Sequence, residues 1–155
     1  MKFVAQEDIE APVDAVFDAV SDFESFERSA MRRGAEVVRT DGMAEPAVGM
    51  GWRGRFQFRG RDRNVQVVLA RFDRPNGMTF DSIAQGMTGQ FIIDLVPLSR
   101  SRTRMVVTLD LTPQTLSAKL FVQSMKLARN KLAKRYKKRV AVFAEGLEER
   151  HRRRA

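Results

Sequence analysis

Residues 9–26 read IEAPVDAVFDAVSDFESF, and this stretch decides the fold because it takes the chain from a strand into two consecutive short helices. Pro12 is typical of a first helical position, where its missing N–H is not needed. The apolar side chains that follow have helical spacing: Val13, Val16, Phe17 and Val20. We therefore predict a helix over 12–20 and a second short helix that Asp22 caps and Gly34 ends.

The chain on either side of these helices has the alternation of strands. Residues 2–10, KFVAQEDIE, alternate between apolar and polar side chains, and AEVVRT at 35–40 reads as another strand. Glycines and an Asn-Gly pair then occur at short intervals along the sequence, which is typical of hairpin turns. The close turns predict an antiparallel meander with further strands at 51–59, 61–73, 77–84, 88–97 and 102–111.

The segment GWRGRFQFR at 51–59 shows this alternation most clearly. One face carries Trp52, Phe56 and Phe58, and the other carries arginines. The arginine row consists of Arg53, Arg55, Arg59, Arg61 and Arg63. Arginines next to aromatic rings are typical of single-stranded nucleic-acid binding. Because alternation puts the two kinds of side chain on opposite faces, we expect rings and cations on separate surfaces and interpret the row as a solvated cationic face.

The last third of the chain predicts one long amphipathic helix. Thr112 is a suitable cap, Pro113 fits the first turn, and no helix breaker follows until Gly146. Steps of three or four residues join its apolar side chains: Phe121, Met125, Ala128, Leu132, Tyr136, Val140, Phe143 and Leu147. At 1.5 Å per residue such a helix is about 50 Å long, so we expect its end to overhang the sheet or to bend.

An antiparallel sheet with one apolar face needs a cover, and the three helices provide it. The sequence therefore predicts a two-layer α+β fold. The opening stretch resembles that of the START-like superfamily, also called SRPBCC or Bet v 1-like, which includes polyketide cyclase/dehydrase and lipid-transport proteins. The matching residues are Ile9, Ala11, Pro12, Val16, Phe17, Val20, Asp22 and Phe26. The segment RFDRPNGMTF at 71–80 is similar to the family's turn before its next strand.

The resemblance implies a helix-grip fold, in which a curved seven-stranded antiparallel sheet wraps around a long C-terminal helix. Two short helices follow the first strand. Between the sheet and the long helix such a fold leaves a cavity, which in the family accepts hydrophobic or amphipathic molecules.

Composition narrows the class of protein further. The chain has 155 residues, 43% hydrophobic and 30% charged, which suits one domain at 1–150 followed by a basic tail at 151–155. It has no cysteine, and its single histidine, His151, lies in that tail, so we expect no metal and no cofactor. Met1 leads into a charged, alternating segment, and no run approaches the roughly 18 apolar residues of a spanning helix. We therefore expect a cytoplasmic location.

The candidate ligand-binding residues are those on the inward face of the strands and on the first half of the long helix. They are Trp52, Phe56, Phe58, Phe80, Phe91, Ile93, Met105, Val107, Phe121 and Met125. Each one alone is adequately explained by core packing. Together they suggest more, because a sheet curved around a helix leaves part of its concave side unfilled. The leading hypothesis is binding or transport of a lipid-like or polycyclic molecule without catalysis.

The first alternative is a polyketide cyclase/dehydrase-type enzyme, which requires an inward acid or base. Asp94 lies among apolar neighbours in IIDLV, but the parity of Ile93 and Leu95 predicts that it points outward into solvent. Tyr136 falls on the inward stripe, where its ring packs and its hydroxyl is satisfied locally. The catalytic residues are therefore unknown, and a fold shared by many activities assigns none.

The second alternative follows from the charge distribution. From Lys119 onward the chain has 13 basic and three acidic residues, a balance of +10 within a net charge of +9. Such a basic segment attracts anionic membrane surfaces or nucleic acid. The helix residues available for docking are Lys134, Arg135, Lys137 and Lys138. We do not expect nucleic acid to be the partner, because no base-reading group accompanies these cations.

Overall fold

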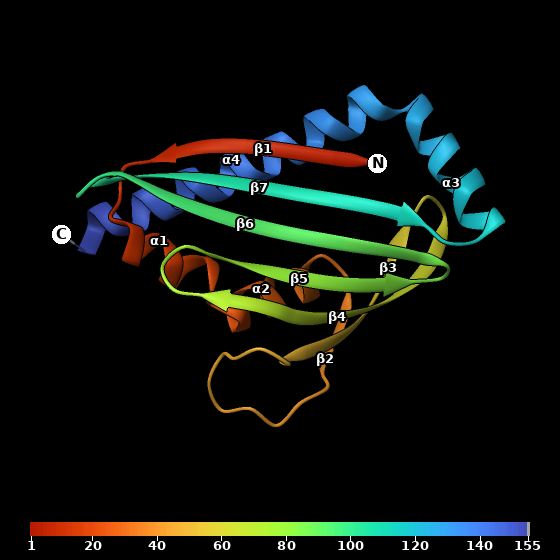
Figure 1. Ribbon diagram of the computed structural model, residues 1–155, viewed down its shortest axis with the longest axis horizontal. Helices are drawn as coiled ribbons and strands as arrows, with labels where there is room; N and C mark the ends of the chain where they lie inside the picture. The colour runs from red at the N-terminus through yellow and green to blue at the C-terminus, as the bar shows by residue number, and fades with distance from the viewer. Residues whose placement is uncertain (155) are drawn as a thin grey trace.

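The computed structural model describes residues 1–154 of the chain. Seven strands and four helices follow one another in the order that the sequence predicts, apart from the division of the last helix (Figure 1). Their bounds are β1 (Lys2–Ile9), α1 (Val13–Val20), α2 (Phe23–Arg32), β2 (Glu36–Arg39), β3 (Gly51–Phe58), β4 (Arg61–Asp73), β5 (Gly77–Ala84), β6 (Met87–Ser99), β7 (Arg102–Pro113), α3 (Leu116–Leu127) and α4 (Arg129–Arg154).

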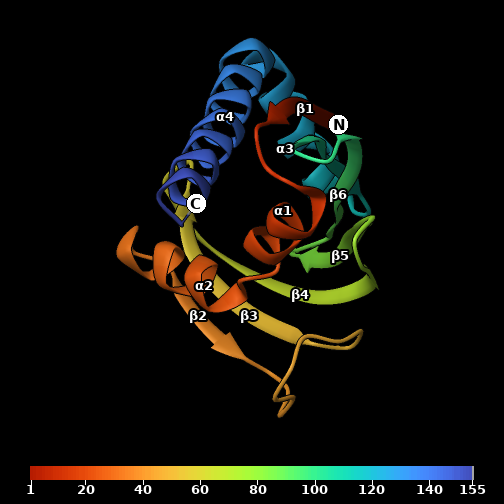
Figure 2. The same cartoon turned by 90° about the vertical axis from the view of Figure 1, so that its left-hand side faces the viewer.

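All seven strands belong to one antiparallel sheet. Its strand order is β1-β7-β6-β5-β4-β3-β2, so every strand after β2 pairs with its neighbour in sequence and β1 closes onto β7. Figure 2 shows the sheet curving around the helices, which all approach it from the concave side. The predicted α+β helix-grip fold is therefore confirmed.

The two short helices form where the sequence predicts them. The stripe along α1 buries Val16, Phe17 and Val20, and α2 begins after Asp22, whose Oδ1 accepts a hydrogen bond from the Ser25 amide at 3.4 Å. The two predicted short helices are therefore confirmed to within two residues at each end.

The single long helix predicted after Thr112 is wrong in its start, its continuity and its end. β7 continues through Pro113, and Thr115 is the cap, because its Oγ1 accepts a hydrogen bond from the Ala118 amide at 3.2 Å. The helix is interrupted at Ala128, which separates α3 from α4, so the expected bend is present. Gly146 does not end α4, since the helix runs on to Arg154.

The last turns of α4 include most of the segment predicted as a basic tail. Arg152 and Arg153 pair with Glu149 at 2.6 and 3.2 Å, at helical spacings of three and four residues, which supports helix there. Residues 151–154 therefore extend α4. Ala155 lies outside the described residues.

The helices cover the concave face in two separate parts. α4 lies along β1 and contacts α1, so it covers the β1 edge of the sheet (Figures 1 and 2). α2 lies over the opposite half, where the Phe23 ring lies 5.3 Å from that of Trp52 and 5.8 Å from that of Phe80. The half of the concave face under α2 and beside α3 is therefore not packed against α4, and the α2 and α3 residues line pockets there.

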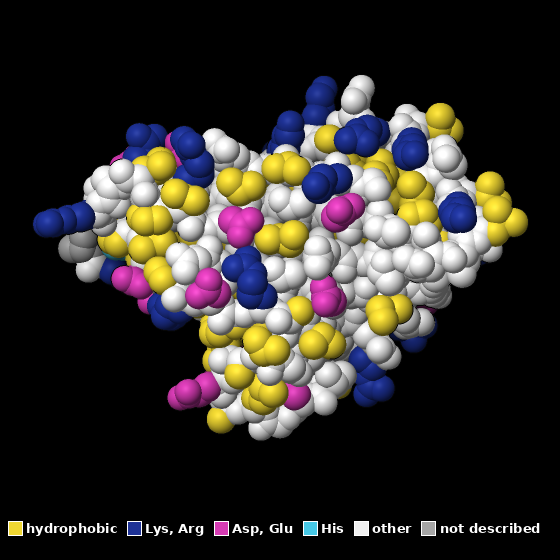
Figure 3. All heavy atoms as spheres, viewed as in Figure 1, with side chains coloured by type: hydrophobic (Ala, Val, Ile, Leu, Met, Phe, Trp, Pro, Cys, Tyr) yellow, Lys and Arg dark blue, Asp and Glu magenta, His cyan; other side chains and the backbone are white. Residues whose placement is uncertain are grey.

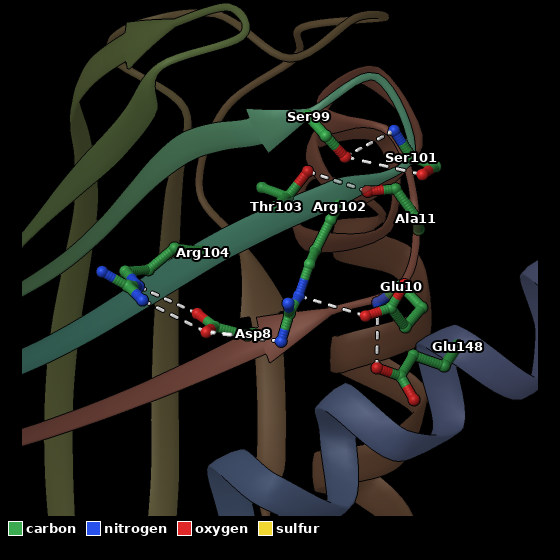
Figure 4. A network of polar contacts seen from close by, with 9 residues as sticks. All are labelled: Asp8, Glu10, Ala11, Ser99, Ser101, Arg102, Thr103, Arg104 and Glu148. Carbon is green, nitrogen blue, oxygen red and sulfur yellow. Dashed lines mark hydrogen bonds and ion pairs between the residues drawn. The ribbon is translucent and has the colours of Figure 1, made fainter.

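A polar network ties the end of β1 to β7 and α4 (Figure 4). Arg104 donates two hydrogen bonds to the Asp8 carboxylate, at 2.9 and 3.2 Å, and this pairing lowers the pKa of Asp8 below its ordinary value. The buried Thr103 hydroxyl donates to the Ala11 carbonyl at 2.8 Å. The Glu10 amide donates to the Glu148 carboxylate at 2.9 Å. The Glu10–Glu148 contact holds α4 to the β1 edge, and the other contacts join β1 and the residues after it to β7.

Candidate functional site

Two adjoining pockets lie on the part of the concave face that α4 does not cover, and a third lies beside them at the β2 edge of the sheet. The α2 pocket lies under α2 and has a volume of about 420 Å³. The α3 pocket lies between α3 and the β3–β4 and β5–β6 turns and has a volume of about 670 Å³. The edge pocket, at the β2 side, has a volume of about 790 Å³. Val65 lines all three, so the pockets meet at its side chain.

The α2 pocket is almost entirely apolar. Aromatic rings from three strands line it, and Phe23 of α2 lines its helix side. Its strand-borne aromatic residues are Trp52, Phe80 and Phe91. Successive rings along this wall are 6.0 Å (Trp52–Phe80) and 6.2 Å (Phe80–Phe91) apart. The one acidic residue in the lining is Glu27, which is half-buried.

The α3 pocket combines an apolar wall with a cationic rim. Its wall includes Phe56, Phe58, Met87, Phe121 and Met125, and its rim consists of Arg59, Arg61 and Arg63 from the β3–β4 hairpin. The Phe58 and Phe121 rings meet edge-on with centroids 6.1 Å apart. This arrangement suits a molecule with both an apolar and a polar part.

The edge pocket is lined by more polar groups. Arg55 and Asp62 form an ion pair of 2.8 Å within its lining, and the hydrogen bond from Arg55 lowers the pKa of Asp62. Arg33, Glu36 of β2 and Arg139 of α4 complete a mixed set of charges. Apolar ligands therefore fit the α2 and α3 pockets better than this one.

Eight of the ten predicted ligand-binding residues line the α2 or α3 pocket. The α2 pocket includes Trp52, Phe80, Phe91 and Ile93, and the α3 pocket includes Phe56, Phe58, Phe121 and Met125. The other two, Met105 and Val107, are 1% and 4% exposed and belong to the buried core under α4. The strands that face α4 are thus packed, and the pockets lie toward the other half of the sheet.

The two ionisable residues considered from the sequence both lie where they were predicted. Asp94 is on the outer face, exposed, and pairs with Arg71 at 3.1 Å. The Tyr136 hydroxyl donates to the Val107 carbonyl at 2.7 Å, and burial raises the pKa of Tyr136 to about 12. Neither group is placed to exchange a proton with a molecule in the pockets.

The predicted separation of rings and cations fails at the β3–β4 hairpin. Arg53 and Arg55 do point away from the rings, but the Arg63 guanidinium lies 4.6 Å from the centre of the Phe121 ring. The reason is the turn at Gly60, after which Arg61 pairs with Phe58 and Arg63 pairs with Phe56. Directly paired residues of antiparallel strands project from the same face, so these arginines join the rings.

Glu27 and the inward arginines are the site residues that the sequence reasoning missed. The helical spacing of Phe23, Glu27 and Ala30 puts all three on the pocket side of α2, and this signal was available in the sequence. The strand parity of Arg61 and Arg63 after the Gly60 turn was also available.

Two further observations bear on the kind of site. Across residues 1–154, no group of three acidic or histidine side chains lies close enough together to hold a metal ion. In the same part of the chain, no helix has the length and apolar character that crossing a bilayer requires.

A curved antiparallel sheet with apolar pockets under its helices defines a ligand-binding helix-grip protein. The chain belongs to the family described as polyketide cyclase / dehydrase and lipid transport, whose model matches residues 1–148. The START-like resemblance of the sequence is therefore confirmed. A search of curated proteins finds no match to the chain.

Solved structures of low sequence identity share the fold. The Zhui aromatase/cyclase from Streptomyces sp. R1128 is 15% identical with a TM-score of 0.67, covering 97% of this chain and 94% of that one. TTHA0849 from Thermus thermophilus is 18% identical with a TM-score of 0.66, covering 97% and 96%. A point mutant of norcoclaurine synthase from Thalictrum flavum, solved with a transition-state analogue, is 11% identical with a TM-score of 0.67, covering 97% and 96%.

Proposed function

We propose that residues 1–150 act as one domain that binds or transports a small hydrophobic or amphipathic molecule, lipid-like or polycyclic, without catalysing a reaction on it. The observation that carries this proposal is the pair of adjoining apolar pockets, α2 and α3, that share Val65 and Ser82. Their volumes, about 420 and 670 Å³, lie in the range of ligand sites. Burial of apolar ligand surface, worth about 25 cal/mol per Å², would drive binding.

The family description, which includes both lipid transport and polyketide cyclase / dehydrase, is consistent with this ligand class. An enzymatic role of cyclase/dehydrase type would depend on Glu27, the acid that lines the α2 pocket. We favour binding for three reasons. The Tyr136 hydroxyl donates its hydrogen bond to a backbone carbonyl, and Asp94 forms an ion pair with Arg71. In addition, no carboxylate lines the α3 pocket.

Phe121→Arg tests the assignment of the pocket. The neutral fluorescent probe N-phenyl-1-naphthylamine is expected to bind the wild-type protein saturably. The variant places a cation in the apolar wall beside Arg59 and Arg63, so affinity should fall at least about tenfold, equivalent to about 1.4 kcal/mol.

Leu127→Arg is the matched control, because it makes a comparable change on the same helix at a side chain that is 91% exposed. It should bind the probe as the wild type does. Equal probe affinity in Phe121→Arg, with thermal unfolding unchanged, would overturn the site assignment.

A second candidate function, docking on an anionic membrane surface, is favoured by the exposed face of α3. Leu116, Leu120 and Leu127 are 74%, 63% and 91% exposed, and their spacing of four and seven residues aligns them along one side of the helix. Exposed leucines so aligned on a helix are typical of an interfacial, membrane-contacting face.

The charges around this leucine face are all of one sign. Between Asp110 and Glu145 the sequence has nine Lys and Arg residues and no acidic residue. Figure 3 shows hydrophobic side chains beside Lys and Arg side chains at the α3 end of the molecule. Cations flanking an apolar helix face complement an anionic bilayer, whereas nucleic acid offers the leucines no apolar partner. Lys134, Arg135, Lys137 and Lys138 of α4 would add electrostatic attraction.

The triple variant Leu116→Ser, Leu120→Ser, Leu127→Ser is expected to lower binding to phosphatidylglycerol-containing vesicles at least about tenfold in a sedimentation assay, because the apolar contact is removed. Neutralising the four α4 cations to glutamine should lower binding at low salt by a similar factor. A control triple variant, Val68→Ser, Ile83→Ser, Val96→Ser, should bind normally, since these side chains are also exposed but project from the outer face of the sheet, opposite the helices. Unchanged binding of the α3 variant would contradict the docking face.

A further inference from the structure

The rim of the α3 pocket contains three arginines held close together by the β3–β4 hairpin. Arg61 and Arg63 pair with Phe58 and Phe56 across the two strands, so both project from the concave face. Arg59 lies in the turn itself with a φ of 52°, and its guanidinium lies 6.0 Å from the centre of the Phe121 ring. The hairpin thus brings three cations to one end of an apolar pocket.

Nothing on the described part of the chain neutralises these cations. The lining of the α3 pocket includes no Asp and no Glu, and within residues 1–154 none of the three arginines forms an ion pair. Arg63 donates from Nε to the Phe58 carbonyl at 3.3 Å, a backbone contact that fixes its position and leaves its charge unpaired.

The neighbouring pockets show that this charge pattern is specific to the α3 pocket. In the edge pocket, Arg55 is paired with Asp62 at 2.8 Å. In the α2 pocket, the ionisable group in the lining is Glu27, an acid. The edge pocket also has three arginines, Arg33, Arg55 and Arg139, but Glu36 and Asp62 accompany them, whereas no acidic residue lines the α3 pocket. An anionic group would therefore be attracted most strongly to the α3 pocket.

We propose that the α3 pocket binds an amphiphile with one anionic head group, a carboxylate or a phosphate. The head group lies against Arg59, Arg61 and Arg63, and the apolar tail lies along Phe58, Phe121 and Met125. Guanidinium groups bind both oxyanions through paired N–H donors. The Phe121 ring contacts both Arg63 of the charged rim and Phe58 of the apolar wall, so the two parts of the pocket adjoin at this ring. This inference rests on the proposed function and narrows its ligand class.

Isothermal titration calorimetry with three ligands of the same chain length tests the proposal. Dodecanoate is expected to bind the wild-type protein at least about fivefold more tightly than dodecan-1-ol, because three arginines attract its head group and one exposed charge pair alone gives up to about that ratio. Dodecyltrimethylammonium should bind more weakly than either. The preference for dodecanoate should shrink between about 0.05 and 0.5 M salt, because the rim is open to solvent. Dodecyl phosphate then distinguishes a phosphate from a carboxylate preference.

The double variant Arg61→Gln, Arg63→Gln should bring dodecanoate to the affinity of dodecan-1-ol. Arg53→Gln is the matched control, because Arg53 lies in the same hairpin on the opposite face, and it should keep the preference. Equal affinity of the wild type for acid and alcohol, or a preference that survives in the double variant, would overturn the head-group site and leave the apolar pocket intact. Failure of the wild type to bind the neutral probe would instead overturn the proposed function, and this inference with it.

Discussion

Val65→Trp is expected to lower the affinity for N-phenyl-1-naphthylamine by more than about tenfold while the protein stays folded. Val65 is half-buried on the concave face, and it lines the α2, α3 and edge pockets together. It pairs with Gly54, where an added Cβ would lie 3.1 Å from the Val65 Cγ1, so the valine already fills the space over that glycine. An indole at this point would occupy the junction of the pockets and displace an apolar ligand from both.

The control for this substitution is Val68→Trp in the same strand. Val68 is 45% exposed and has the opposite parity, so its side chain projects from the outer face. This variant should bind the probe with wild-type affinity in a fluorescence titration. Tight probe binding in Val65→Trp, with circular dichroism like that of the wild type, would mean that the ligand does not occupy the concave face.

Phe17→Ala is expected to lower the free energy of unfolding by about 4 kcal/mol, as measured by urea denaturation. Phe17 is 0% exposed, and its ring packs 5.2 Å from that of Phe72, with the Arg74 guanidinium 4.4 Å from its centre. Removing the ring would leave a cavity where α1 meets the sheet, and α1 is the element that connects β1 to α2.

The matched control for Phe17→Ala is Phe26→Ala on the next helix. Phe26 is 41% exposed and packs mainly on Phe143, with ring centroids 5.5 Å apart. Its loss should change the free energy of unfolding by only about 1 kcal/mol, the size of one aromatic pair. Similar losses for the two variants would contradict the placement of the core under α1.

Period-two alternation and turn residues were sufficient to predict the sheet. The strands predicted at 61–73 and 77–84 coincide with β4 and β5. The sequence marks the ends of both strands, because a glycine or a proline lies in each of the turns that bound them. The order of elements predicts a two-layer α+β fold, and the resemblance of residues 9–26 to the START-like superfamily implies the helix-grip form of it. Strand parity predicts that Trp52 and Phe80 face inward.

The local sequence pattern could not predict which helix covers which part of the concave face. The residues around Ala128 have good helical propensity and continuous apolar spacing, so only tertiary packing of α3 and α4 on different parts of the sheet places a break there. For the same reason the sequence does not show that α4 packs over Met105 and Val107, leaving the pockets to the other half. Sites formed between elements depend on such packing, which no single segment encodes.

Native mass spectrometry of the protein, first as purified and then after incubation with dodecanoate or dodecan-1-ol, tests ligand binding in the pockets most directly. The proposed function predicts a one-to-one adduct, either already present after purification or formed on incubation, and predicts that Val65→Trp lacks it. Only the ligand-free mass after incubation with both amphiphiles, at concentrations well above micromolar, would contradict the proposal that these pockets bind a hydrophobic or amphipathic molecule.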